Sequence, residues 1–198
     1  MNRAATYLGA VVGVALALSV ACGNTRDHSI VEPLPQANAG PPHILVTNDD
    51  GYSSEGIAAL AEALAAFADV AVVAPRVNES GASQSRRAYK RESIQLHNVT
   101  IGDHLPGYAL DGPPTDCVFL GVRIFEAERP FDLVVSGINH GMNTGDTYNY
   151  SGTVGAAFEA LNNGIPGIAV SQSKQRTEYT TAARFAALIA QRVIAQPL

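Results

Sequence analysis

HILVTNDDG, residues 43–51, is the most informative stretch of this chain. A short, mostly β-branched segment ends there in two adjacent carboxylates, Asp49 and Asp50, followed by Gly51. Neighbouring side chains of a strand point to opposite faces, so the two carboxylates converge only if the strand stops before them. Gly51 permits such a turn. Both aspartates then lie at the carboxyl end of the strand, where open α/β sheets bind their ligands.

The aspartate pair has two interpretations. Two unpaired carboxylates side by side repel each other, and a bound divalent cation relieves that repulsion. The alternative is a turn with solvated carboxylates, because Asn, Asp and Gly dominate turns. The stretch alone leaves both interpretations open.

Apolar strands alternate with amphipathic helices along the rest of the chain, and this order is typical of a parallel sheet. We therefore expect a doubly wound, mostly parallel, Rossmann-like α/β fold. The further strands are predicted at residues 70–74, 132–135 and 167–170, with short strand-like pieces around 94–96 and 108–110, and helices are predicted to begin at Ser54, Pro114, Gly152 and Thr177.

The composition is that of one ordinary globular domain. The 198 residues are 46% hydrophobic and carry a net charge of −5, so there is no basic footprint for a nucleic acid duplex. One of the two cysteines, Cys117, lies in an apolar run, and we expect it to be a buried core residue.

The N-terminus has the pattern of a secretory signal. Arg3 supplies a positive charge, small and apolar residues follow without interruption from Ala4 to Val20, and the junction at Cys22 resembles a bacterial lipobox. An uncleaved membrane anchor or a misassigned start codon would give a similar pattern.

These patterns predict three parts of the chain. Residues 1–22 form the signal peptide with its lipobox, residues 23–42 form a proline-rich tether, and residues 43–198 form the folded domain. We expect an exported protein of the bacterial periplasm or cell envelope, anchored to a membrane by a lipid on Cys22.

A second candidate site is SGTVGAA, residues 151–157, which opens a predicted helix with hydroxyls and little side-chain bulk. Exposed backbone N–H groups at such a terminus bind anions, above all phosphate. Plain capping by Ser151 is the alternative. The segment lacks the lysine of a nucleoside-triphosphate P-loop.

Four oxygen donors follow predicted strands. Such donors suit Mg²⁺, Mn²⁺ or Ca²⁺ and not a zinc site of thiolate and imidazole. Each has a simpler interpretation as a turn residue. The four are Asp49, Asp50, Ser80 and Asn139; His140 lies beside them and is expected to be a neighbour, not a ligand.

The ordered set of motifs resembles the SurE family of metal-dependent 5′/3′-nucleotidases, also called stationary-phase survival proteins. The resemblance covers about residues 43–173. The matching segments are TNDDG (47–51), VVAP (72–75) with Asn78, SGAS (80–83), GPPTDCV (112–118), VVSGIN (134–139) and YSGTV (150–154).

The resemblance implies roles for particular residues. The two aspartates, the serine and the first asparagine of the matched motifs would hold the metal, and these are Asp49, Asp50, Ser80 and Asn139. The residues around the phosphate would be Asn143, Ser151, Gly152 and Thr153.

Three features depart from the family. Arg76 replaces a common aspartate, an exported N-terminus is unusual in a family that is mostly cytoplasmic, and the chain stops at Leu198. Family members continue for some tens of residues, with a hairpin used in subunit exchange. We therefore expect a C-terminally truncated domain, and the homodimer and full activity that the family implies stay open.

The expected function is that of a metal-dependent phosphomonoesterase, a 5′-nucleotidase acting on nucleoside monophosphates. Mg²⁺ or Mn²⁺ would be the cofactor, with Asp49 orienting or deprotonating the attacking water. One alternative is a lipid-tethered phosphate- or nucleotide-binding protein without turnover. The other is a phosphatase with an aspartyl nucleophile, for which Lys90 and Lys174 lack a supporting motif.

Overall fold

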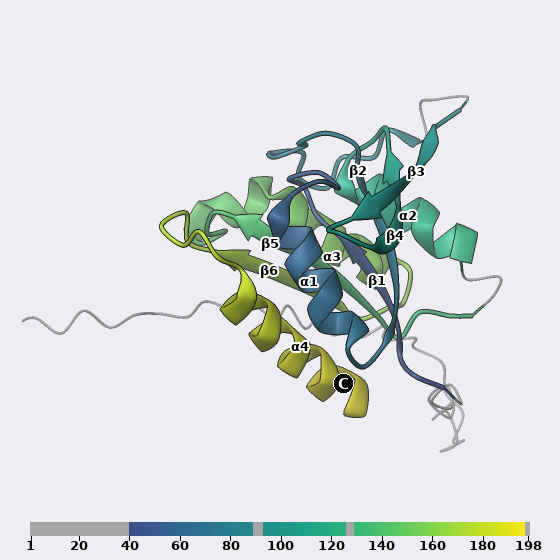
Figure 1. Cartoon of the computed structure of the whole chain (residues 1–198). Helices are drawn as coiled ribbons and strands as arrows, with labels where there is room; N and C mark the ends of the chain where they lie inside the picture. The colour runs from purple at the N-terminus through teal and green to yellow at the C-terminus, as the bar shows by residue number, and fades with distance from the viewer. Residues whose placement is uncertain (1–39, 89–92, 126–128, 197–198) are drawn as a thin grey trace, which may run out of the picture.

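Within the residues that the computed structural model describes, 40–88, 93–125 and 129–196, six strands form one sheet (Figure 1). Their order is β3-β4-β2-β1-β5-β6. Neighbouring strands are parallel except for the edge pair β3 and β4, which confirms the predicted mostly parallel α/β fold. The strands are β1 (His43–Thr47), β2 (Asp69–Pro75), β3 (Leu96–Ile101), β4 (Leu105–Leu110), β5 (Leu133–His140) and β6 (Gly167–Gln172).

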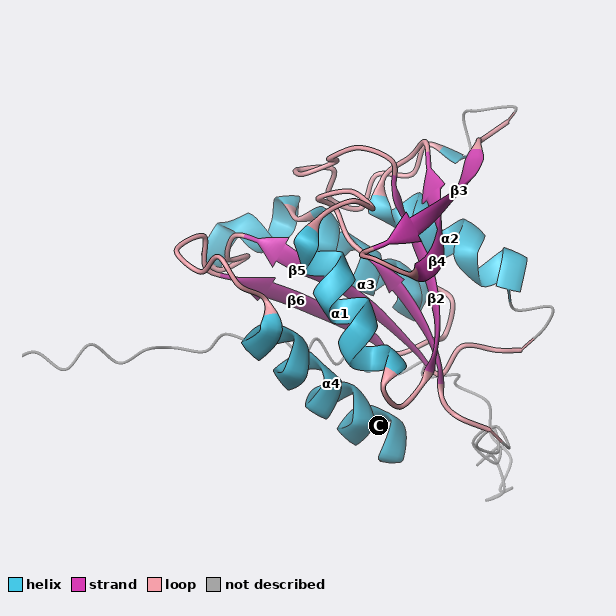
Figure 2. Cartoon of the chain, viewed as in Figure 1, coloured by secondary structure: helices cyan, strands magenta, loops and turns pink. Residues whose placement is uncertain are grey.

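Helices cover both faces of the sheet. Helices α1 (Glu55–Ala65) and α4 (Thr180–Ala195) pack together over one face, in front of the sheet in Figure 2. Helices α2 (Pro114–Phe125) and α3 (Gly152–Asn162) pack over the other face. Strand β1 serves both cores, because its side chains alternate between a core under α1 and a core under α2.

The apolar patterns place the helices and central strands well. Ile57, Leu60, Ala61 and Leu64 recur at helical spacing in the sequence, and all four are buried on α1. Cys117 is buried in the core under α2 as expected. Several boundaries differ. Helix α4 begins at Thr180 and not at Thr177, and β4 begins at Leu105, before the expected piece at 108–110. Strand β3 begins only at Leu96 and runs to Ile101, so the expected piece at 94–96 lies almost entirely before it. Strand β5 continues to His140, with a register shift against β6 between Ser136 and Asn139.

Ser54 occupies the N-cap position of α1, but its side chain makes no capping hydrogen bond. The hydroxyl instead accepts a hydrogen bond of 2.8 Å from the side-chain amide of Asn48. That amide also donates to the carbonyl oxygen of Gly51, at 2.9 Å. The serine therefore braces the turn that carries the two aspartates.

The signal peptide predicted at 1–22 and most of the tether predicted at 23–42 lie outside the described residues. Among the described helices, none has the length and apolar character needed to span a membrane.

Candidate active site

The loops that follow β1, β2 and β5 lie at one edge of the sheet, because these strands are neighbours or near neighbours and run in the same direction. The loop after β1 carries the aspartate pair, the loop after β2 carries Ser80, and the end of β5 carries Asn139. Three of the sequence-predicted segments thus reach the same edge.

Asp49 is buried, with 3% of its surface exposed. The hydroxyl of Thr153 donates a 2.7 Å hydrogen bond to Asp49 Oδ1, although the two residues are 104 positions apart. Burial raises the pKa of Asp49, and the charge of Asp50 raises it further, while Thr153 pulls that pKa down through its hydroxyl and its backbone N–H. A buried carboxylate beside a second carboxylate is the arrangement that a cation would stabilise.

Asp50 joins the loops after β2 and β5. Its Oδ2 accepts a hydrogen bond of 3.0 Å from the backbone N–H of His140. Its Oδ1 accepts a bond of 3.3 Å from the side-chain amide of Asn78. These two bonds fix the carboxylate, and among the described residues each of its oxygens accepts one of them and has a further lone pair.

Ser80 is exposed and lies in a loop that is tied to both aspartates. Its backbone N–H donates to Asn78 Oδ1 at 2.9 Å, and the same asparagine contacts Asp50. The backbone N–H of Glu79 donates to the carbonyl oxygen of Asp49 at 2.7 Å. The structure therefore brings the Ser80 loop to the aspartate pair through its neighbours in the chain.

Asn139 is partly buried and its amide nitrogen is already used. Nδ2 donates to the carbonyl oxygen of Gly141 at 2.7 Å, which leaves Oδ1 as the atom that can ligate a hard cation. His140, the next residue, contacts Asp50 only through its backbone, and its ring lies 3.0 Å from the hydroxyl of Tyr179. The expectation that His140 is a neighbour of the site matches this geometry.

The donor set suits a hard divalent cation. It consists of two carboxylates, a hydroxyl and an amide oxygen, and no group of three or more His, Cys, Asp or Glu side chains with metal-site geometry occurs in the described part of the chain. Zinc sites are built from imidazole and thiolate, whereas Mg²⁺, Mn²⁺ and Ca²⁺ take oxygen donors. The chemistry of the four donors fits a hard divalent cation, and their role as a metal site stays a prediction.

Helix α3 begins directly against Asp49. A Cβ atom placed on Gly152 would lie 2.9 Å from Asp49 Cβ and 3.2 Å from Asp49 Oδ2, so only glycine permits this approach. Ser151 caps the helix, since its Oγ accepts a 3.1 Å hydrogen bond from the N–H of Val154. The capping interpretation of Ser151 is thus confirmed, and an anion site at this terminus would depend on backbone groups.

Asn143 contacts β6 at Ser171, the residue that pairs with Asn139 of β5. Its side-chain amide donates to the hydroxyl of Ser171 at 2.9 Å. Its predicted role at the phosphate stays a prediction.

The bracing of the Ser80 loop was not predicted from the sequence. Arg87 donates two hydrogen bonds to the carboxylate of Glu79, at 2.8 and 2.6 Å. Asp116, in the first turn of α2, accepts backbone N–H groups of Arg87 and Ala88. The signal available in the sequence was a run of charged residues within a loop otherwise rich in small polar ones.

The model of the family described as "Survival protein SurE" matches residues 44–198. A protein named 5′-nucleotidase SurE from Alkalilimnicola ehrlichii is 48% identical over 157 residues, which cover 79% of this chain and 58% of that protein. Another of the same name from Sulfurovum sp. is 50% identical over 131 residues, covering 65% of this chain and 47% of that protein. The chain therefore spans about half the length of the curated relatives it matches.

A solved structure has a similar fold. The crystal structure of the SurE protein from Aquifex aeolicus has a TM-score of 0.68 and 39% sequence identity. The match covers 79% of this chain and 62% of that one.

Proposed function

The chain belongs to the SurE family, and on that premise we propose that it is a metal-dependent phosphomonoesterase acting on nucleoside monophosphates. The family membership confirms the resemblance of the ordered motifs. The relatives named 5′-nucleotidase SurE support a nucleotidase reaction. They support neither of the two alternatives, the binding protein without turnover and the aspartyl-nucleophile phosphatase.

One observation carries the proposal more than any other: the start of α3 lies against a buried aspartate that is paired with a second one. Gly152 approaches Asp49 closely, and Asp50 is fixed beside it. A phosphate placed at the helix terminus would thus lie next to the oxygen donors of the metal set. Catalysis of phosphoryl transfer requires this combination of anion binding and charge stabilisation.

The backbone groups at the start of α3 have different tasks. The N–H of Ser151 donates to the carbonyl oxygen of Tyr148, and the N–H of Thr153 faces Asp49 closely enough to lower its pKa. The third backbone N–H of this terminus belongs to Gly152. Within the described residues it has no hydrogen-bond partner, so it is free to face an anion. We therefore assign phosphate binding first to Gly152 among the residues predicted for it.

Asp49 would orient or deprotonate the attacking water. Thr153 holds the carboxylate in one orientation through its hydrogen bond to Asp49 Oδ1. A divalent cation held by Asp49, Asp50, Ser80 and Asn139 would supply Lewis-acid stabilisation of the phosphoryl group and a lower pKa for water.

The experiment compares the wild type with Asp50→Asn. Phosphate release from a nucleoside 5′-monophosphate is measured with Mn²⁺ or Mg²⁺, and Mn²⁺ affinity is measured by isothermal titration. We expect Asp50→Asn to lose both activity and affinity while it stays folded, because one charge of the cation site is removed. Asp103→Asn, an exposed aspartate in the turn between β3 and β4, is the matched control and should behave as the wild type.

Two results would contradict the proposal. Unchanged Mn²⁺ affinity in Asp50→Asn would remove the metal assignment. A wild-type protein that binds nucleotide or phosphate but releases none with either metal would favour the binding protein without turnover.

We also propose that the protein is exported and anchored by a lipid on Cys22. The support is the N-terminal pattern of Arg3, the apolar run and the small residues before Cys22. A multiply acylated cysteine anchors a protein stably, whereas a single chain binds only marginally. Cys22→Ser should move the protein from the membrane fraction to the soluble fraction or leave an uncleaved precursor. Equal fatty-acid labelling of wild type and Cys22→Ser would refute lipidation.

A further inference from the structure

We propose that a hollow beside the start of α3 binds the base of the nucleoside monophosphate, with Tyr148 as the stacking surface. This inference rests on the proposed function, because that function supplies the phosphate end of the same ligand. The hollow has a volume of about 220 Å³. Its wall includes Ser83, Gln84, Tyr148, Asn149, Ser151 and Phe158.

The hollow adjoins the candidate phosphate site. Ser151 contributes to its wall and is also the N-cap of α3, one residue before the glycine that lies against Asp49. A nucleotide whose phosphate lies at the helix terminus therefore has the hollow as an adjacent place for its base. The ribose would connect the two, near Ser151.

The wall of the hollow is held in place by close contacts. The hydroxyl of Ser83 donates to the carbonyl oxygen of Asn149 at 2.8 Å. The backbone N–H of Ser83 donates to the carbonyl oxygen of Tyr150 at 3.2 Å. A Cβ atom on Gly155 would lie 2.2 Å from the carbonyl oxygen of Ser83, so the loop after β2 rests directly on α3. The loop that carries Ser80 is thereby joined to the helix that begins at the phosphate site.

The size and chemistry of the hollow fit one flat ring system. Pockets for whole drug-sized ligands measure about 300–1,000 Å³, and a hollow of about 220 Å³ is smaller than that range. The rings of Tyr148 and Phe158 line it, and Gln84 and Asn149 add amide groups. Every nucleobase has a π-face that stacks on an aromatic ring, and amides can bond its edge.

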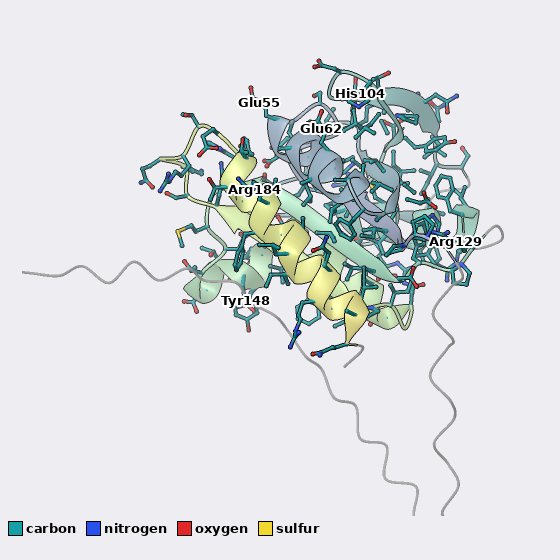
Figure 3. The ribbon with its side chains drawn as sticks, turned by 60° about the horizontal axis from the view of Figure 1, so that its bottom comes forward. Glu55, Glu62, His104, Arg129, Tyr148 and Arg184 are labelled. Atoms are coloured by element: carbon teal, nitrogen blue, oxygen red, sulfur yellow. The ribbon has the colours of Figure 1, made fainter. Side chains whose placement is uncertain are left out.

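Tyr148 is available for stacking in this structure. It belongs to the 3-10 helix η2 (Gly145–Tyr150), and 45% of its surface is exposed. Figure 3 shows its side chain at the surface, beside the faint green ribbon of α3. The next aromatic residue of the same element, Tyr150, is 68% exposed and does not line the hollow, so it provides a matched control.

The experiment titrates the full chain with adenosine and, separately, with inorganic phosphate by isothermal titration in the presence of Mn²⁺. Base stacking on an aromatic ring is lost when the ring is truncated, and we expect Tyr148→Ala to weaken adenosine binding by about tenfold or more. Tyr148→Phe keeps the ring and should bind adenosine as the wild type does. Tyr150→Ala should also be unchanged, and phosphate affinity should be the same in all four proteins.

Steady-state kinetics distinguish recognition of the base from recognition of the phosphate. Tyr148→Ala should raise KM for a nucleoside monophosphate by a similar factor and leave KM for glycerol 2-phosphate, which has no base, unchanged. Equal adenosine affinity in wild type and Tyr148→Ala, or no adenosine binding by the wild type, would overturn the inference.

The two proposals fail in distinguishable ways. Tyr148-dependent adenosine binding by a protein that hydrolyses no phosphomonoester would support the base site and refute the enzyme activity. Phosphate release from nucleotides that is independent of Tyr148 would support the enzyme activity and refute the base site.

Discussion

Replacing Thr153 with valine removes the hydrogen bond that stabilises Asp49 and changes little else. Valine has nearly the shape of threonine, so no cavity forms. The lost bond is 2.7 Å long and joins two buried side chains, Thr153 with 0% and Asp49 with 3% of its surface exposed, so water cannot replace it. Hydrogen bonds to charged groups contribute about 1.5–3 kcal/mol. We expect Thr153→Val to lower the free energy of unfolding of the metal-free protein by about that amount, or the Tm by about 3–12 °C.

The pH dependence of this loss has a definite sign. Burial raises the pKa of Asp49 above its ordinary value of 3.8 in the folded protein, and removal of the Thr153 hydroxyl raises that pKa further. The advantage of wild type over Thr153→Val is therefore full at pH values above both folded pKa values. It shrinks as the pH falls through them, because the carboxyl becomes protonated and no longer depends on the donor.

Urea denaturation of the chelator-treated protein at several pH values measures both effects. Thr153→Ser retains the hydroxyl and loses one methyl group, which costs about 0.8 kcal/mol with no such pH dependence. A double-mutant cycle with Asp49→Asn isolates the pair. The reasoning is refuted if Thr153→Val costs the same in the wild-type and Asp49→Asn backgrounds, or if its cost does not change with pH.

Three further predictions follow from single contacts. Gly152→Ala should weaken binding of Mn²⁺ as well as phosphate, because the new Cβ would lie 2.9 Å from Asp49 Cβ and displace that side chain; unchanged titration curves for both ligands would contradict the close packing. Arg87→Met should lower the free energy of unfolding by less than about 1 kcal/mol, because the ion pair with Glu79 is partly exposed. The same change should speed proteolysis within residues 76–88, and an unchanged cleavage rate would show that the ion pair does not brace this loop. Burial raises the pKa of Cys117 well above its ordinary value, so in Cys22→Ser protein mass spectrometry should find no alkylation by iodoacetamide at pH 8 until denaturant is added.

Much of the candidate site could be anticipated because its residues follow predicted strands. A parallel sheet brings the carboxyl ends of its strands to one edge, which is why the loops after β1, β2 and β5 meet there. What could not be anticipated is how each side chain is used there. Asp50 is held by Asn78, 28 positions away, and by the backbone of His140, 90 positions away. Such partners depend on loop conformations that have no periodic signal in the sequence.

The two serines at helix starts illustrate the same limit. Both Ser54 and Ser151 stand before an apolar helical pattern, so the sequence makes each of them a candidate N-cap. In the fold, Ser151 caps α3, whereas the hydroxyl of Ser54 accepts a hydrogen bond from the side-chain amide of Asn48, in the turn after β1. A cap competes with any nearby donor or acceptor, and only the folded chain determines which partner is nearby.

By itself the sequence determined the strands, the helices and the faces they bury, because these follow from the distribution of apolar residues at a period of two or near 3.6. It also predicted the oxygen-rich donor set, and its ordered motifs indicated the family that the family model confirms. The tertiary structure alone decided that β3 runs antiparallel at the edge, that Gly152 lies against Asp49, and that Thr153 bonds it across 104 residues. The physical reason is the range of the forces involved: burial of an apolar face is encoded locally, whereas a contact between distant segments exists only once the whole sheet has positioned them.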